Sequence, residues 1–353
     1  MSRRVLVVRL DSVGDVLLSG PAVRAVAAHA TVDLLTSPTG APAASLLPGV
    51  RRVHEWDCPW IGNPARPTTP ATIEELGAIL ADAGPDEAVI LTSFHQSPLP
   101  LALQLRLAGV ERVAGASVDY AGSLLDVRLR PGEDFPESQS EVTRALAIAS
   151  AAGYELPPGD DGRLAVHPVP SAVPLVGPGP YVVVHPGAAV PARAWPVVQH
   201  IEAVQALVDA GVRVVVTGSA AERGATARVA GDVALDLGGR TDLPALAGVL
   251  ASADAVVVGN TGAAHLAAAV GTPVVSLFSP VVDEVCWRPY GVPAILLGRT
   301  DTDCAGTRAR ECPVPGHPCL ADVDPSSVVE AVLAIRKRSS AEHSELRPEV
   351  VPA

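Results

Sequence analysis

Short apolar runs alternate with helical patterns along most of this chain, and no other feature of the sequence limits the possible folds as strongly. Strands buried on both faces are predicted at VLVV (5–8), AVILTS (88–93), YVVVHPG (181–187), VRVVVTGS (212–219) and AVVVGNTG (255–262). Helices are predicted between them at EELGAILADAG (74–84), SEVTRALAIASAAGY (140–154) and VVQHIEAVQALVDAG (197–211). Strands that alternate with helices predict parallel sheets covered by helices on both faces.

A stretch rich in proline and glycine, HPVPSAVPLVGPGP (167–180), interrupts this alternation and reads as a joint between domains. The chain of 353 residues has room for two cores. We therefore expect an α/β protein of two doubly wound domains, residues 1–170 and 171–324, with a ligand cleft between them at the C-terminal strand ends. Residues 325–338 are predicted to form a last helix, with packing back on the first domain as an option, and residues 339–353 a disordered tail.

The net charge of −12 argues against nucleic acid as a partner, because a protein that binds its backbone normally presents a basic face. The basic block that stands out is RKR at 336–338. No signal peptide is recognisable after SRR at 2–4, and every apolar run is broken before it reaches membrane-spanning length. We expect a cytoplasmic protein, and peripheral contact with a membrane surface stays open.

The segment RLDSVGDVLLSGPAVRAV (9–26) places two carboxylates, Asp11 and Asp15, directly after the first predicted strand. Loops at the C-terminal ends of strands carry the chemistry of open α/β folds. From the residues alone Asp15 fits two roles, a capping carboxylate at a helix start or a general base at the cleft. Pro21 either kinks that helix or marks the first turn of a helix that begins near Ser19.

Two later loops suit an anionic ligand. HPGAAVPARAWP (185–196) carries Arg193 just before a predicted helix, where an arginine and helix N–H groups together bind phosphate well; a surface arginine is the alternative. GNTGAAHLAAAVGTP (259–273) is a polar, glycine-bearing loop ahead of a helix, which suits a phosphate although it has neither a Walker lysine nor a GxGxxG pattern. His265 in that helix either donates to a diphosphate or bonds to a core carbonyl.

Three of the five cysteines, Cys304, Cys312 and Cys319, lie in CAGTRARECPVPGHPC (304–319), with His317 nearby. Zinc ligands usually come in closely spaced pairs, and the spacing here is wider. A metal site, a local disulfide and ordinary loop packing all stay open, with packing favoured. No pairing of Asp or His has the spacing of a dedicated metal cage, so we predict no metal and no cofactor.

Together these segments resemble glycosyltransferase family 9, the heptosyltransferase family, over nearly the whole chain. RLDSVGDVLLSGPAVRAV resembles the family's opening strand, GD turn and helix, and VVVHPGAAVPARAWP resembles its segment ending in K-x-WP. VVVTGSAAER, VVVGNTGAAHLAAAVGTPVVSLFSP and CAGTRARECPVPGHPCL resemble its TG loop, its glycine–histidine block and its cysteine-bearing loop. The resemblance implies a GT-B fold of two facing Rossmann-like domains. It also implies an enzyme of lipopolysaccharide biosynthesis that transfers heptose from ADP-heptose, with inversion and without an essential metal.

The same resemblance assigns roles to residues. Asp15 matches the family's proposed base, with Asp11 as the fallback, and the first domain is expected to bind the acceptor. The second domain is expected to bind the nucleotide-sugar donor. Its matching residues are Arg193 in place of the family's lysine, Thr217, Gly218, the ribose-binding Glu222, and the diphosphate loop of Asn260, Thr261, Gly262, Ala263 and His265, in which Asn260 replaces an aspartate often found there.

The acceptor is a glycan, a glycolipid or a small molecule. We expect it to contact His54, Trp56, His95 and Gln96, because HEWDCPW (54–60) and TSFHQSP (92–98) offer polar and flat groups suited to a sugar. Two alternatives stay open for the function. One is a GT-B transferase or epimerase that uses a UDP- or GDP-sugar, and the other is a sugar-nucleotide-binding protein without activity.

Overall fold

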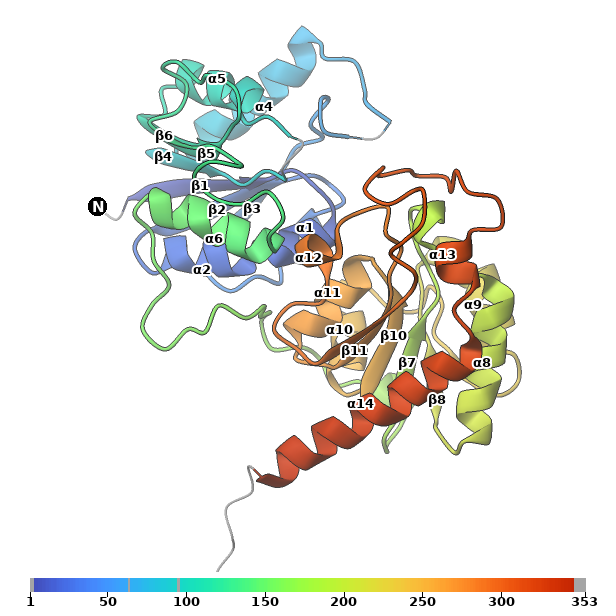
Figure 1. Cartoon of the computed structure of the whole chain (residues 1–353). Helices are drawn as coiled ribbons and strands as arrows, with labels where there is room; N and C mark the ends of the chain where they lie inside the picture. Colours follow the sequence, from blue (N-terminus) through green and yellow to red (C-terminus); the bar gives the residue numbers. More distant parts are fainter. Residues whose placement is uncertain (1–2, 63, 94–95, 346–353) are drawn as a thin grey trace, which may run out of the picture. The chain divides into compact units, whose positions relative to one another are not determined.

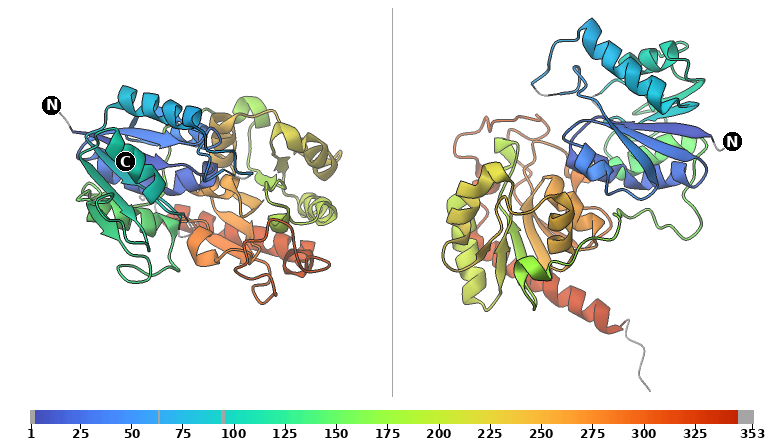
Figure 2. Two further views of the ribbon diagram at one scale, coloured as in Figure 1. Left: turned by 90° about the horizontal axis from the view of Figure 1, so that it is seen from above. Right: turned by 180° about the vertical axis from the view of Figure 1, so that it is seen from behind.

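The apolar runs of the sequence form the strands of two parallel sheets in the computed structural model, which describes residues 3–62, 64–93 and 96–345. The chain divides into two compact units, Met1–His167 and Pro168–Ala353. Each unit is one six-stranded sheet with helices on both faces (Figures 1 and 2). The division falls at the start of the proline- and glycine-rich stretch 167–180.

The sheet of the first unit has the strand order β3-β2-β1-β4-β5-β6. Its strands are β1 (Arg4–Arg9), β2 (Thr31–Thr36), β3 (Val50–Glu55), β4 (Glu87–Ile90), β5 (Arg112–Ala116) and β6 (Val127–Leu129). Its helices are α1 (Val13–Leu18), α2 (Gly20–Ala27), α3 (Ala41–Ala44), α4 (Pro70–Ala83), α5 (Leu99–Leu107) and α6 (Glu141–Ala151). Helices α4 and α5 cover one face of the sheet, and α2 and α6 cover the other (Figure 1).

The sheet of the second unit has the order β12-β11-β10-β7-β8-β9. Its strands are β7 (Val182–His185), β8 (Val214–Val216), β9 (Leu235–Asp236), β10 (Ala255–Gly259), β11 (Val274–Leu277) and β12 (Ala294–Leu297). Its helices are α7 (Val173–Val176), α8 (Val197–Asp209), α9 (Arg223–Ala230), α10 (Leu243–Ala251), α11 (Gly262–Ala269), α12 (Glu284–Trp287), α13 (Pro318–Ala321) and α14 (Pro325–Glu345), with short 3-10 turns η1 (Pro191–Arg193) and η2 (Ala220–Glu222). Both sheets therefore follow one topology, the doubly wound order in which the direction of winding reverses beside the first strand.

Local sequence signals explain where several helices begin and end. The Thr69 side chain accepts a hydrogen bond from the N–H of Thr72 in a capping box, so α4 begins at Pro70, four residues before the predicted helix. The Asp242 side chain accepts from Ala245 N at 2.8 Å, as its position predicts for an N-cap. Gly211 follows α8 with φ +77°, which is the left-handed conformation typical of a residue that ends a helix.

Pro21 marks the first turn of a second helix instead of a kink. Helix α1 ends at Leu18, Ser19 is the N-cap of α2, and Pro21 occupies the first turn, where its missing N–H costs no hydrogen bond. Asp15 therefore lies in the first turn of its own short helix.

Helix α14 belongs to the core of the second unit. Its apolar face, which includes Val328, Val332 and Ile335, packs there with Val204 and Leu207 of α8. It also continues to Glu345, beyond the predicted end at 338, because SSAEHSE contains no helix breaker before Pro348. Residues 346–353 of the expected tail lie outside the described residues.

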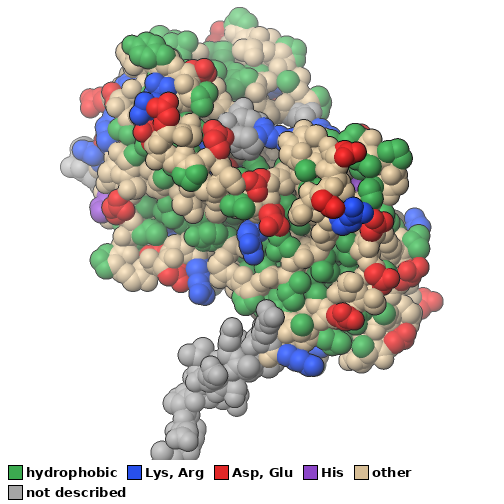
Figure 3. Space-filling view, in the orientation of Figure 1, with side chains coloured by type: hydrophobic (Ala, Val, Ile, Leu, Met, Phe, Trp, Pro, Cys, Tyr) green, Lys and Arg blue, Asp and Glu red, His purple; other side chains and the backbone are tan. Residues whose placement is uncertain are grey.

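Charged side chains of both signs are interspersed over the face seen in Figure 3, and they do not gather there into one basic surface. Within the described parts of the chain, every helix is either too short or too polar to span a bilayer.

Candidate functional site

Polar loops follow the central strands of both sheets at the position where the strand order reverses. In the first unit, β1 pairs with β4, and the loops after them carry Asp11, Asp15 and Ser93. In the second unit, β7 pairs with β10, and the loops after them carry Arg193 and Asn260. Crevices beside such reversals are where doubly wound sheets bind ligands. Each unit therefore has its own candidate site.

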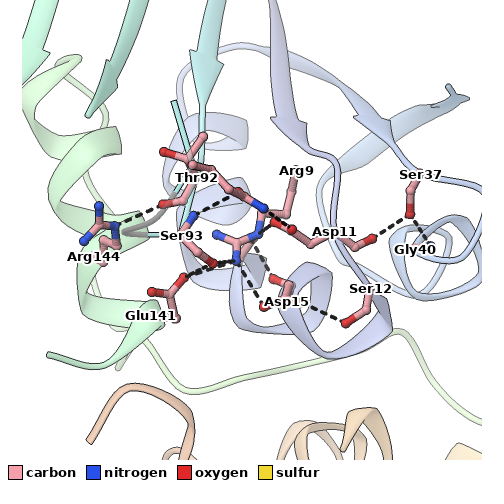
Figure 4. A network of polar contacts seen from close by, with 12 residues as sticks. Arg9, Asp11, Ser12, Asp15, Ser37, Gly40, Thr92, Ser93, Glu141 and Arg144 are labelled. Carbon is pink, nitrogen blue, oxygen red and sulfur yellow. Dashed lines mark hydrogen bonds and ion pairs between the residues drawn. The ribbon is translucent and has the colours of Figure 1, made fainter. Parts of the chain in front are cut away.

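In the first unit, the guanidinium group of Arg9 lies at the centre of a cluster of oxygen atoms (Figure 4). Its Nε is 2.8 Å from an oxygen of Asp11, and its Nη2 is 3.1 Å from Asp15 Oδ1 and 3.1 Å from Glu141 Oε2. Nη2 also donates to Ser93 Oγ at 2.7 Å. The side chains of Arg9 and Glu141 are each only 2% exposed. Four separate elements thus converge on one buried cation.

The loop that carries the two aspartates is fixed by its backbone. Ser37 Oγ donates to the carbonyl oxygen of Asp11 at 2.6 Å and accepts from Gly40 N at 3.0 Å. A Cβ on Gly40 would lie 2.9 Å from the same carbonyl, so only glycine allows this close approach. Ser12 Oγ donates to Asp15 Oδ2 at 2.7 Å. The position of both carboxylates is therefore set by the fold of the first unit.

The two aspartates differ in how far they are buried. The pKa of Asp11 is raised to about 6, because burial and the neighbouring charge of Asp15 outweigh the lowering by Arg9 and by a hydrogen bond from Gln96. The Asp15 side chain is 21% exposed, against 13% for Asp11. Asp15 is therefore the more accessible of the two aspartates, and the raised pKa of Asp11 lets that side chain take up a proton in mildly acidic solution.

The structure corrects two of the predicted acceptor contacts. His54 is buried, and its Nε2 lies 3.0 Å from Asp33 Oδ2. Trp56 is 1% exposed, and its indole N–H donates to the carbonyl of Thr72 at 3.2 Å. Both side chains belong to the packed interior of the first unit, where a sugar cannot reach them.

The other two predicted acceptor residues follow β4. Gln96 donates to Asp11 Oδ1 and thus joins the Arg9 cluster. His95 lies outside the described residues.

In the second unit, two buried side-chain donors at the start of α11 lack partners. Asn260 is 4% exposed, and its Nδ2 has no hydrogen-bond partner among the described residues. Thr261 is the N-cap of α11, yet its Oγ1 makes no capping bond and has no partner within the same described set. Buried donors are rarely left without an acceptor in proteins. A ligand oxygen at the N-terminus of α11 would satisfy both.

The predicted neighbours of this loop are arranged around it. A Cβ on Gly259 would lie 3.2 Å from the carbonyl oxygen of Arg193, so turn η1 approaches the end of β10 closely. Ala263 and His265 are buried in α11, which begins at Gly262. Arg193 therefore belongs to the same corner of the second unit as the loop of Asn260.

Glu222 is held by the turn that follows β8. Its Oε2 accepts from Ser219 N and Ser219 Oγ, each at 2.7 Å. A Cβ on Gly187 would lie 2.0 Å from Glu222 Oε1, so the loop after β7 has no room for a side chain there. Thr217 is fully buried, and its Oγ1 lies 2.9 Å from His185 Nδ1. Gly218 completes this turn, because a Cβ there would lie 2.6 Å from Thr226.

The cysteine-bearing loop packs under the turn that carries Arg193. Cys304 belongs to one core cluster with Ala192, Phe278, Val281 and Val282, and Cys312 packs against it. All five cysteines have free thiols, and burial raises the pKa of the Cys319 thiol. Within the described residues, no group of three or more His, Cys, Asp or Glu is arranged to hold a metal ion. The structure thus matches ordinary packing, and the disulfide alternative is not formed.

Sequence reasoning missed Arg9, Ser93 and Glu141. Arg9 ends an apolar strand, and Glu141 follows an N-cap serine, so both fit ordinary positions in a strand and a helix. The signal that could have revealed Arg9 is a charged residue at the C-terminal end of a central strand, followed by two carboxylates.

Comparison with known proteins gives consistent matches over both units. The model of glycosyltransferase family 9 (heptosyltransferase) matches residues 105–317. Lipopolysaccharide heptosyltransferase 2 of Escherichia coli K12 is 25% identical over 356 residues, which covers 94% of this chain and 98% of the relative.

Solved structures give the same result. The E. coli ADP-heptose LPS heptosyltransferase II has a TM-score of 0.74 at 22% identity, covering 96% of this chain and 99% of its own. The E. coli heptosyltransferase WaaC with ADP-2-deoxy-2-fluoro heptose has a TM-score of 0.68 at 22% identity, covering 94% and 99%. The two parallel sheets therefore have the GT-B fold of these structures.

Proposed function

The chain belongs to glycosyltransferase family 9, and from this premise we propose that it transfers heptose or a closely related sugar from an ADP-sugar to a hydroxyl group of a glycan or glycolipid. We further propose that the transfer inverts the anomeric centre and requires no metal ion. The observation that carries the donor assignment is the pair of buried, unsatisfied donors at Asn260 and Thr261. The oxygens of a diphosphate bound at this helix N-terminus would accept hydrogen bonds from both side chains.

The second unit is proposed to stabilise the leaving diphosphate. Negative charge develops on the diphosphate as the bond to the sugar breaks. The cationic side chain of Arg193, the N–H groups from Thr261 to Ala263, and His265 are the groups that we assign to it. An arginine grips phosphate through two nitrogens, so it can replace the lysine typical of the family at this position. The N-cap turn that holds Glu222 is assigned to the ribose.

The first unit is proposed to activate the acceptor. Asp15 accepts the proton of the attacking hydroxyl group, the new bond forms on the face of the anomeric carbon opposite the diphosphate, and ADP leaves. Asp15 suits this role because it is the most exposed of the three carboxylates beside Arg9. Gln96, which bonds to Asp11, is the described residue that we retain as an acceptor contact.

Isothermal titration calorimetry with ADP, UDP and GDP in the presence of EDTA tests the donor assignment. We expect selective binding of ADP that persists with EDTA, weakens about tenfold or more in Arg193→Ala, and weakens in Asn260→Asp, which places a carboxylate beside the diphosphate. Tighter binding of UDP or GDP would reassign the donor. Failure to bind any nucleotide would contradict a transferase function.

Transfer itself is tested with ADP-heptose and a panel of acceptors that includes deacylated lipopolysaccharide core. ADP release that depends on one acceptor, together with mass spectrometry of the product, identifies the reaction. The configuration of the new linkage, measured by NMR, decides whether transfer inverts.

A further inference from the structure

Three carboxylates surround the buried Arg9 in the first unit, and a second buried cation, Arg144, lies nearby and donates to the carbonyl oxygen of Thr92. Arg9 contacts Asp11, Asp15 and Glu141 at 2.8–3.1 Å, so the cluster has more negative than positive charge when all three acids are ionised. Burying an excess of like charge is costly, and proteins keep such clusters mainly where a function needs them. Glu141, the first residue of α6, is the least exposed of the three carboxylates, at 2% against 13% for Asp11 and 21% for Asp15.

We propose that Arg9 and Glu141 are positioning residues for the base: Arg9 holds Asp11 and Asp15 in place, and Glu141 together with Ser93 holds Arg9. This inference rests on the proposed function, since it concerns the same carboxylates. It goes further by assigning a role to three residues on β1, on α6 and in the loop after β4 that touch no substrate.

The contacts around Arg9 support these positioning roles. Arg9 Nη2 donates to Asp15 and to Ser93, and Ser93 Oγ donates to Glu141 Oε2 at 3.0 Å, so Ser93 and Glu141 brace the side of the guanidinium group away from Asp11 (Figure 4). The guanidinium group is planar, so fixing one edge fixes the direction of its other N–H groups. Asp15 and Glu141 both contact Nη2 of Arg9. The orientation of Asp15 therefore depends on Glu141.

Glu141 also sets how strongly the base attracts a proton. Arg9 favours the ionised form of both aspartates, and Glu141 opposes that effect by adding negative charge on the same guanidinium. The other described titratable groups near the cluster are Arg144, whose Nε donates to the carbonyl of Thr92 on the same side, and the Cys58 thiol, which lies near Asp11. Replacing Glu141 leaves both of these side chains in the protein, so the comparison isolates the charge of Glu141.

The direction of the expected shift follows from these charges. Glu141→Gln keeps the shape of the side chain and removes one buried negative charge. The remaining carboxylates then lose a proton more easily, so their titration midpoint moves down by about one pH unit. Arg9→Lys keeps the charge but concentrates it on one nitrogen, which cannot serve all the oxygens. In that variant the midpoint moves up.

The first test needs no substrate. Full-length protein labelled with carboxyl-carbon-13 aspartate is titrated by NMR, and the two signals are assigned with Asp11→Asn and Asp15→Asn. Glu87→Gln is the matched control, because Glu87 is also buried and bound by Arg3, Arg112 and Tyr154. It is the first residue of β4, so it lies at the N-terminal end of the strand, whereas the Arg9 cluster lies beyond the C-terminal end. We expect a downward shift for Glu141→Gln and no shift for the control.

The second test uses the pH dependence of transfer from ADP-heptose to the acceptor identified above. The acid limb of the kcat profile is expected to move down in Glu141→Gln, with KM for the donor unchanged. Ser93→Ala is expected to lower kcat about tenfold through loss of orientation, again without a change in donor KM. A uniform loss at all pH values with both aspartate signals unmoved would overturn the proposal.

The two proposals fail in different ways. If no nucleotide-sugar is used but the aspartate signals shift as expected, the proposed function is wrong and the positioning role of Glu141 stands. If transfer occurs and Glu141→Gln moves neither the signals nor the acid limb, the positioning role is wrong and the function stands. If Glu141→Gln does not fold, the upward shift in Arg9→Lys decides.

Discussion

The ring of His317 lies 3.2 Å from the carbonyl oxygen of Ala192, the residue directly before Arg193. A second bond, from Ala192 N to the carbonyl of Arg310 at 2.9 Å, connects the same residue to the same loop. His317 adopts φ +53°, and Arg308, also in this loop, adopts φ +56°. A positive φ is uncommon outside glycine and is tolerated where the surroundings fix the residue. The cysteine-bearing loop thus supports the turn that carries Arg193.

His317→Ala is predicted to weaken ADP binding about three- to tenfold, because one hydrogen bond to the Arg193 turn is lost. The loss should be smaller than that of Arg193→Ala, since the charge is retained. Calorimetry on both variants measures the difference. His317→Gly is the control, because it also removes the ring but relieves the positive φ. Binding restored to the wild-type level in His317→Gly would show that backbone conformation matters and the hydrogen bond does not.

Asp15→Asn is predicted to lower kcat for transfer about 10²–10⁴-fold, as expected for removal of a general base. ADP affinity should stay within about twofold, because the residues assigned to the nucleotide all lie in the second unit. Initial rates of ADP release and calorimetry check the two parts. Asp11→Asn is the companion variant. A larger loss in Asp11→Asn than in Asp15→Asn would transfer the role of base to Asp11.

Gly187→Ala is predicted to weaken ADP binding about tenfold. The added methyl group would overlap Glu222 Oε1 and displace that carboxylate from its turn, at a cost of about 1–3 kcal/mol. Gly224→Ala in α9 is the matched control, because a Cβ there meets nothing within 4 Å. It should leave ADP binding unchanged and stabilise the protein by about 0.5–1 kcal/mol. An equal change in ADP affinity for the two variants, measured by calorimetry, would contradict the proposed role of Glu222 in binding the ribose.

His200 is predicted to make the protein less stable in mild acid. Burial, with a smaller contribution from nearby His185, lowers the pKa of His200 to about 3. The unfolded chain has a histidine pKa of about 6.5 and therefore binds a proton that the folded state excludes. Neutral, buried His200 therefore contributes its full stabilisation above about pH 6.5. Below that pH the free energy of unfolding falls by about 1.4 kcal/mol for each pH unit. Urea unfolding at pH 7 and pH 5 should show a smaller difference in His200→Leu than in the wild type; an unchanged difference would refute the assignment.

The alternation of apolar runs and helical patterns was sufficient to predict the architecture. Strands buried on both faces depend on residues close in the sequence, and the predicted strands are confirmed. The family was predicted from the loops that follow the strands. Several short motifs in a fixed order identify a family even where each motif alone does not. The assigned site residues stay predictions until they are tested.

The errors concern side chains whose partners are distant in the sequence. His54 pairs with Asp33, 21 residues away, and Trp56 bonds to Thr72, 16 residues away. Histidine and tryptophan are typical of sugar sites, but burial against such partners removes them from solvent. Arg9 was overlooked for the same reason, since Glu141 is 132 residues away. Patterns along the chain do not report contacts of this range.

The Arg9 cluster is complete within one unit: every side chain in it comes from residues 9–141. The donors at Asn260 and Thr261 lie wholly in the other unit. If the proposed roles hold, the residues for acid–base chemistry and those for nucleotide preference can change separately during evolution. A substitution that alters which sugar-nucleotide is held need not disturb the carboxylates, and a new acceptor can be adopted while the old donor is kept. Proteins with this architecture can therefore change the donor or the acceptor while the other is kept.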